Sequence, residues 1–474
     1  MSTPVRRRPA IFGVVALIGC APLLAACTAS SVSLPRAPAT VTLGLLALAP
    51  GDASPQASGG GTPTTGGAAA RGAQLAVDVV NTAHPELPLP LAARAGLSRG
   101  TRLALAAADT GGGPGSAVQA TDQLIRRSHP AGIVVLDSGE VIQAIGQQAE
   151  TAAVPVIDAY TSADALGFLG RTWCFRTGPT DTTLLSTALD ALSQQPPQPP
   201  PQPPPPTPTP TPTPSVSPPA SPGQPAAGGQ GVGQAAPGQA TPRRLVVLDG
   251  AGQVAQSGAP NLPGVSELAL ARGFVVAARL PLSAGAVELA DKLGAQPPDA
   301  VVALVGTDQE AGVVNDVAQK LKAGVPVIAV GPATGVTNPD RRVLRSVGWS
   351  AEYAARNPAA HAVDEMYRQR YGVPMNEAAA RSFTAVLALA AAVDNGLRTG
   401  ALRADMPEPA AHVVVRSEIR QLIFQATDTI MPWDGIQFNT TGQNLLAAAL
   451  VERRVGNDFQ VVYPRELTRR TGTG

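Results

Sequence analysis

The feature that most constrains the fold is a repeated alternation between short apolar runs and stretches with helical periodicity. Apolar runs lie at 41–48, 102–108, 133–136 and 154–157, and a helical pattern follows each of the first three. Runs that are apolar along most of their length are typical of parallel strands covered by helices on both faces. We expect a loop at 51–70 and a first helix at 72–81. This part of the chain therefore predicts a doubly wound α/β lobe.

The same alternation returns in the second half of the chain. Strand candidates lie at 245–248, 274–277, 300–304 and 325–330, again separated by helical patterns. Further on, an apolar stripe from Phe383 to Leu397 predicts a long helix facing the core. The segment from Ile436 to Tyr463 has the pattern of hairpin strands. The predicted fold class is α/β, with two doubly wound, Rossmann-like lobes of similar size.

A proline-rich segment at 195–242 interrupts this pattern. It contains tandem prolines and an alternating Thr-Pro stretch, and it continues as a run rich in Gly, Gln and Ala. Such sequence cannot form a packed core and favours extended, disordered chain. A linker between domains is one interpretation. We favour a disordered insertion within the second lobe, because a helix at 183–192 precedes it and a strand at 245–248 follows it.

The N-terminus has the pattern of an export signal. Three arginines, Arg6 to Arg8, precede an uncharged apolar run and a group of small residues that ends at Ala26. A retained membrane helix is the alternative, but the glycines and Pro22 make this run a poor span. We therefore predict a lipoprotein signal peptide at 1–26. The consecutive arginines leave twin-arginine export open beside the general route.

The predicted cleavage site lies in the sequence LAAC at 24–27, which resembles a bacterial lipobox. In that motif the cysteine accepts the lipid. The sequence LIGC at 17–20 fits loosely, but cleavage there would leave an apolar tail at 21–26. Cys27 is therefore the predicted lipidation site, and 27–40 the flexible tether. The expected location is the extracytoplasmic face of the cell membrane, where acyl chains hold a protein stably.

The composition argues against several classes of protein. Thirty-five basic and 34 acidic residues give a net charge of +1, without the basic surplus of a nucleic-acid-binding protein. Three cysteines and four widely spaced histidines do not predict a disulfide scaffold or a metal site. The sequence around Ser138 is not a nucleophile elbow, and no phosphate-binding loop is recognised. We expect no cofactor, no metal and no enzymatic activity.

Several segments together resemble the type I periplasmic solute-binding proteins of ABC importers, in the branched-chain amino acid and amide branch. The first half contributes GAQLAVD at 72–78, AAAD at 106–109, VPVI at 154–157 and CFRTGP at 174–179. The second half contributes VPVI at 325–328, YRQRYG at 367–372, GIQFN at 435–439 and GQN at 442–444. No single segment is diagnostic; their order and spacing carry the resemblance, which covers most of 41–464.

The resemblance implies two lobes joined by a three-segment hinge, with a ligand held as the lobes close. One lobe would combine 41–178 with 355–428, and the other 180–350 with 432–470. The protein would be a monomer that captures a small polar solute, such as an amino acid or an amide. It would then deliver this solute to the membrane subunits of an ABC permease.

In the first lobe, the resemblance implies ligand-binding roles for Ser138, Ala159 and Thr161. Ser138 and Thr161 follow two successive strands, where free N–H groups and hydroxyls gather at the sheet edge. Their spacing matches the serine and threonine ligands of the family, and Ala159 matches the residue whose carbonyl accepts the ligand ammonium group. The alternative is that both hydroxyl residues are ordinary helix N-caps.

The second lobe departs from the pattern of the family. Relatives that bind α-amino acids have a tyrosine and a glutamate after two of its strands, where this chain has GTDQ at 306–309 and GPAT at 331–334. Thr307 and Thr334 are candidate ligand-binding residues there. Since a buried ammonium group needs a counter-charge, either the ligand is not a zwitterion or another acid binds it. Asp158 and Asp308 are candidates, and both could equally be solvated loop charges.

Two functions remain open from the sequence. The first is the transport function described above. The alternative is a lipoprotein without a transport role, acting in ligand sensing or in cell-envelope interactions, with a modified or degenerate cleft. The altered second lobe and the proline-rich insertion favour this alternative.

Overall fold

The computed structural model describes residues 36–48, 65–137, 139–162, 164, 170–194, 242–250, 264–305, 308–321, 324–331, 342–456 and 458–467. The predicted signal peptide, Cys27, most of the tether and nearly all of the proline-rich insertion lie outside these residues. No helix within them combines the length and the apolarity that a bilayer span needs.

The first part of the chain forms a five-stranded sheet in the order β2-β1-β3-β4-β5, with parallel pairing throughout. Its strands are β1 (Thr40–Ala47), β2 (Arg102–Asp109), β3 (Ile133–Leu136), β4 (Val156–Asp158) and β5 (Cys174–Arg176). Its helices are α1 (Thr65–Asn81), α2 (Pro114–Ser128), α3 (Gly139–Ala152), α9 (Pro358–Tyr371), α10 (Glu377–Thr399) and α11 (Glu408–Arg420). Single 3₁₀ turns occur at η2 (Ser98–Gly100) and η6 (Ala426–Asp428).

The second part forms a seven-stranded sheet in the order β14-β13-β10-β9-β8-β6-β7. The strands β6 (Arg243–Asp249), β7 (Phe274–Pro281), β8 (Ala300–Leu304), β9 (Val327–Val330) and β10 (Val343–Val347) are parallel, whereas β13 (Leu450–Val455) and β14 (Asp458–Tyr463) join antiparallel. The helices that accompany this sheet are α4 (Asp181–Ser193), α5 (Val265–Leu270), α6 (Ala286–Ala295), α7 (Asp308–Lys320) and α8 (Ala351–Arg356). Single 3₁₀ turns are η5 (Leu282–Ala284) and η7 (Arg465–Leu467).

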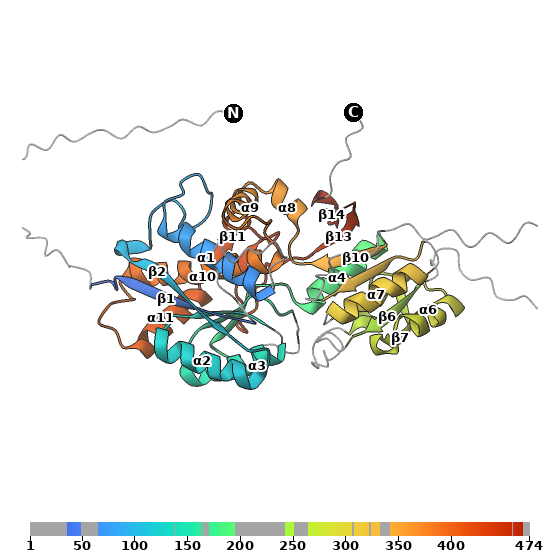
Figure 1. Ribbon diagram of the computed structural model, residues 1–474, viewed down its shortest axis with the longest axis horizontal. Coiled ribbons are helices and arrows are strands. Elements are labelled where there is room, and N and C mark those ends of the chain that lie inside the picture. The colour runs from blue at the N-terminus through green and yellow to red at the C-terminus, as the bar shows by residue number, and fades with distance from the viewer. Residues whose placement is uncertain are drawn as a thin grey trace, which may run out of the picture. The chain divides into compact units, whose positions relative to one another are not determined.

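Helices cover both faces of each sheet, and this confirms the predicted α/β class with two lobes (Figure 1). In the first sheet, Leu45 packs toward α1 and α10, whereas its neighbour Leu46 packs toward α2 and α3. In the second sheet, Val247 faces α4 and α5, and Leu248 faces α6 and α7. Because strand side chains alternate between faces, strands covered on both sides must be apolar at nearly every position. The boundaries of the two lobes along the chain stay a prediction.

Helix α10 is buried around nearly its whole circumference, which is more than the predicted apolar stripe requires. It packs against α1, α11 and the first sheet. The approach to α1 is close: a Cβ atom added to Gly72 would lie 2.2 Å from the carbonyl oxygen of Ala379. The GAQLAVD segment thus begins with a glycine because two helix backbones nearly touch there.

Two expectations about the elements were wrong. The segment 51–70 is not all loop, since α1 begins at Thr65. The sequence did not predict this start because the first residues of α1 are small and show no apolar periodicity. Ile436 does not join the C-terminal hairpin. It lies in β12 (Gly435–Gln437), which pairs with β11 (Ile423–Gln425) in a separate two-stranded sheet, and the hairpin consists of β13 and β14 alone.

The two ends of the proline-rich segment lie close together. Arg243, at the start of β6, donates from Nη1 to the carbonyl oxygen of Leu192 near the end of α4, at 2.8 Å. We therefore expect that replacing 196–242 with a short Gly-Ser loop leaves the fold intact, because the length of a segment that joins two neighbouring ends has little effect on stability. The melting temperature should change by only about a few degrees. Loss of a cooperative transition in calorimetry would instead show that the segment is part of the fold.

Candidate functional site

The loop at the carboxyl end of β4 holds three of the residues predicted to bind a ligand: Asp158, Ala159 and Thr161. Asp158 is the last residue of β4 and is fully buried. Its Oδ1 accepts hydrogen bonds from the backbone N–H groups of Tyr160 and Thr161, both at 2.9 Å. Its Oδ2 accepts from the Thr161 hydroxyl. The carboxylate thus fixes the loop that follows its own strand.

A buried arginine compensates the charge of Asp158. Arg176 is the last residue of β5 and the register partner of Asp158, and its Nε lies 3.4 Å from Asp158 Oδ2. Its Nη1 donates to Gln443 Oε1 at 3.3 Å. Both charged side chains are nearly inaccessible to solvent. The charge of Asp158 is therefore paired with Arg176 inside the protein in this structure.

Thr161 is buried, and both of its hydrogen-bond donors are in use. Its N–H and its hydroxyl donate to the two oxygens of Asp158. A hydroxyl that donates in this way keeps lone pairs that accept. In this arrangement Thr161 can accept a hydrogen bond from a ligand, but it has no donor to offer a ligand carboxylate.

A second buried arginine lies beside Ala159. Arg381 on α10 directs Nη1 at the carbonyl oxygen of Tyr160, at 3.1 Å, and at that of Ala159, at 3.5 Å. Glu377 Oε1 accepts hydrogen bonds from Nε of this arginine, at 2.8 Å, and from its Nη2, at 2.5 Å. The same oxygen accepts from the N–H of Gly348 at 2.9 Å. The Ala159 carbonyl, predicted to accept the ligand ammonium group, therefore already faces a cation.

The other predicted site residues fall largely outside the described part of the chain. The structure does not describe Ser138, Thr307 or Thr334. For Asp308 it describes only the backbone, which starts α7, and not the side chain. Helix α3 begins at Gly139, directly after Ser138. The geometry thus brings together Asp158, Ala159 and Thr161, and the ligand-binding roles of all seven residues stay predictions.

The structure adds one acidic residue that the sequence analysis missed. Asp181, the first residue of α4, is 2% exposed, and its backbone N–H donates to the carbonyl oxygen of Ser162 at 2.6 Å. Burial raises the pKa of Asp181 to about 6, with Asp164 adding to the rise and Ser162 and Arg176 opposing it. An acid in the first turn of a helix is common in any sequence, which is why this one did not stand out.

The chain segments that run between the two sheets are bonded to one another near this loop. Gln443 donates from Nε2 to the carbonyl oxygen of Gly178 at 3.1 Å. Asn444 donates from Nδ2 to the carbonyl oxygens of Thr177, at 3.0 Å, and Gly435, at 3.2 Å. The CFRTGP and GQN segments therefore form one hydrogen-bonded unit.

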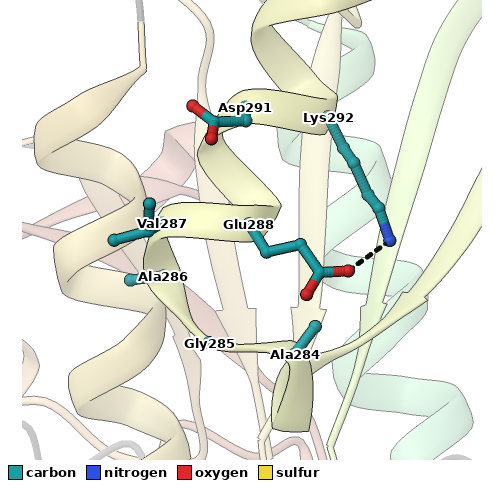
Figure 2. A pocket seen from close by; sticks show the side chains of 7 residues that line it. All are labelled: Ala284, Gly285, Ala286, Val287, Glu288, Asp291 and Lys292. Carbon is teal, nitrogen blue, oxygen red and sulfur yellow. Dashed lines mark hydrogen bonds and ion pairs between the residues drawn. The ribbon is translucent and has the colours of Figure 1, made fainter.

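A hollow of about 540 Å³ lies elsewhere, along the start of α6 (Figure 2). It is lined by Ala284 to Glu288, Asp291 and Lys292, all from one turn and one helix, and an ion pair of 2.6 Å joins Glu288 to Lys292 there. None of the residues predicted to bind a ligand lines it. Among the described residues, no group of His, Cys, Asp and Glu side chains is placed to hold a metal ion.

Comparison with known proteins identifies the fold. A sequence model of a periplasmic binding protein family matches residues 55–198. The structure of an ABC transporter substrate-binding protein from Desulfitobacterium hafniense, in complex with Leu, aligns with a TM-score of 0.59 and 15% identity, covering 89% of this chain and 100% of that one. This chain has the periplasmic binding protein fold. The resemblance seen in the sequence is thereby confirmed.

Two further structures share the periplasmic binding protein fold with this chain. A putative branched-chain amino acid ABC transporter protein from Silicibacter pomeroyi has a TM-score of 0.62 and 16% identity, with 91% of this chain and 98% of that one covered. A solute-binding protein of an ABC transporter from R. palustris, in complex with benzoate, has a TM-score of 0.58 and 14% identity, with 89% and 95% covered. The search of curated proteins finds no matching relative.

Proposed function

We propose that the protein is an extracytoplasmic solute-binding protein that serves an ABC importer. The observation that carries this proposal is the alignment with solved ABC substrate-binding proteins over 95–100% of their length, with both lobes included. The ligand would be a small polar solute, such as an amino acid or an amide, bound beside the loop that follows β4. In open parallel sheets, ligands bind at this carboxyl edge.

We also propose that the protein binds without catalysing a reaction and acts at the membrane as a lipoprotein. The LAAC sequence supports lipid attachment at Cys27, which would keep the protein near the membrane subunits of its permease. A monomer is sufficient for this role, since each chain carries both lobes.

Substitution of Thr161 tests the site. We expect Thr161→Ala to weaken solute binding by about 1–3 kcal/mol, because it removes an acceptor from the site and releases the loop from Asp158. Titration calorimetry with L-leucine, the ligand of one structural relative, measures this effect. Thr161→Ser is the matched control: it keeps the hydroxyl and should restore binding. Unchanged affinity in the alanine variant would place the ligand elsewhere.

A binding protein without a transport role, in sensing or in the cell envelope, is the second candidate. One observation favours it: the donors of Thr161 and the charge of Asp158 are already satisfied within the protein. Such a site could have lost the ligand of its relatives. Solute uptake by cells that lack the gene separates the two functions, since loss of uptake supports transport and unchanged uptake supports the second candidate.

A further inference from the structure

Arg381 lies against three parts of the chain that are far apart in sequence. It is on α10, and its side chain is 4% exposed. Its Nη1 donates to the carbonyl oxygens of Tyr160 and Ala159, in the loop beside which we propose that the solute binds. The same guanidinium lies against Gly178 and Gly348. These two glycines are in segments that lead from one sheet toward the other, after β5 and after β10.

The guanidinium fills the space that a side chain at either glycine would need. A Cβ atom added to Gly178 would lie 2.8 Å from Nη1 of Arg381, and one added to Gly348 would lie 2.5 Å from its Nη2. Neither glycine has a positive φ, so the backbone conformation itself does not require glycine. The missing side chains at these two positions therefore let one arginine lie against both segments.

The segment that contains Gly348 is held from two sides. Its N–H donates to Glu377 Oε1 at 2.9 Å, and this oxygen also accepts from Arg381. Two residues later, the side chain of Ser350 is hydrogen-bonded to Glu452, which is buried on β13 of the second sheet. This short segment is thus anchored both to α10 and to the second sheet. A movement of one anchor relative to the other has to change the backbone between them.

We propose that Arg381 is a positioning residue that couples solute binding at the loop after β4 to the two segments that join the sheets. A solute that bonds to this loop shifts the carbonyl groups that the guanidinium holds. The planar guanidinium is also bonded through Glu377 to Gly348, so its shift changes the position of the joining segments. Arg381 acts through the loop and not by contact with the solute.

This inference rests on the proposed function, because it needs a solute at the loop, and it adds the residue that transmits binding. A ligand can shift an equilibrium between two arrangements of a protein only through interactions that differ between them. The contacts of Arg381 with the loop and with both joining segments provide such interactions.

The first test is a double-mutant cycle on affinity. We expect Arg381→Lys to lower the affinity for L-leucine by about tenfold, because a lysine cannot bond Glu377 and the loop carbonyls in one plane. We expect Gly178→Ala to lower it by about fivefold, since the new methyl group displaces the guanidinium. In the Arg381→Lys chain the same alanine should have no effect, because the displaced nitrogen is gone. Losses that multiply independently would show that Gly178 acts by itself and would overturn the inference.

These variants should fold, and a matched control is available on the same helix. Glu377 is 27% exposed, so water solvates its carboxylate when the arginine is replaced. Arg398, also on α10, is exposed and donates to Asn395 at 3.2 Å. Arg398→Lys should therefore leave the affinity for L-leucine unchanged.

Hydrogen exchange provides a readout that a merely structural role would not move. In the wild-type protein, saturating L-leucine should slow amide exchange both in the loop 159–162 and in the segment 346–350. In Arg381→Lys, saturating L-leucine should still slow exchange in the loop but leave 346–350 at its ligand-free rate. If both segments are protected in this variant, another part of the chain carries the coupling and the inference is overturned.

The outcomes separate this inference from the proposed function. If the wild-type protein does not bind L-leucine, the probe is the solute that raises the melting temperature most in a screen of amino acids, amides, urea and polyols. If the wild-type protein binds its probe and Arg381→Lys binds it equally well, the inference is overturned and the function stands. If the wild-type protein binds no solute of the screen, the proposed function fails, and the inference fails with it.

Discussion

Replacement of Arg176 by methionine is expected to destabilise the protein by about 3–5 kcal/mol. The arginine is almost completely buried and pairs with the equally buried Asp158. Removing it leaves a carboxylate inside the protein without a counter-charge, and the hydrogen bond to Gln443 is lost as well. Denaturant unfolding of the ligand-free protein at pH 7 measures the change. The effect should be large because Asp158 also holds the loop of Tyr160 and Thr161.

The double variant Arg176→Met with Asp158→Asn is the control for this prediction. An asparagine at 158 keeps an oxygen that can accept from the two backbone N–H groups. It carries no charge, so no unpaired charge is left buried when Arg176 is replaced. We therefore expect the double variant to recover at least half of the lost stability, and a double-mutant cycle to give a coupling of about 2 kcal/mol. If the two substitutions instead destabilise additively, the ion pair is not what stabilises the end of β4.

Replacement of Gly442 by alanine is expected to destabilise the protein by about 3 kcal/mol, through backbone strain and steric overlap together. Gly442 has a φ of +79°, and a Cβ atom there would lie 2.2 Å from the carbonyl oxygen of Cys174. The Gly442 carbonyl also accepts from the N–H of Arg176 at 2.8 Å, so the two segments cannot separate without losing this bond. Thermal unfolding followed by circular dichroism measures the effect.

Gly456, in the β13–β14 turn, is the matched control for the steric part of this effect. Its φ of +67° is similar, but an added Cβ would meet no atom within 4 Å. Gly456→Ala should therefore destabilise the protein by only about 1 kcal/mol, from backbone strain alone. Equal losses in the two variants would contradict the close approach of the GQN and CFRTGP segments.

The order of elements could be predicted where apolar runs stand between turns. Strands β3 and β8 begin and end where the sequence places them, because β3 is an apolar run between Gly132 and Asp137 and β8 is an apolar run that starts directly after Asp299. Strand β10 was missed, since Arg345 interrupts its pattern; this arginine pairs across the sheet with the buried Glu452. Strand β4 begins two residues later than predicted, after Pro155, which has no N–H group to donate to a ladder.

The candidate site could be predicted only in part. The position of Asp158, Ala159 and Thr161 at a strand end follows from the local pattern of apolar and polar residues. The partners of these residues do not, because Arg381 lies more than two hundred residues away in sequence and reaches the loop from α10. Asp181 was missed because its distinguishing property, the burial that raises its pKa, exists only in the folded chain.

A thermal-shift screen of the purified protein against amino acids, amides, urea and polyols tests the central proposal most directly. A ligand that binds only the folded state raises the melting temperature by mass action. The account predicts that at least one amino acid raises it by about several degrees at a concentration 100-fold above its dissociation constant. If every compound leaves the melting temperature unchanged at millimolar concentration, the protein does not bind solutes of this class, and the proposed function is wrong.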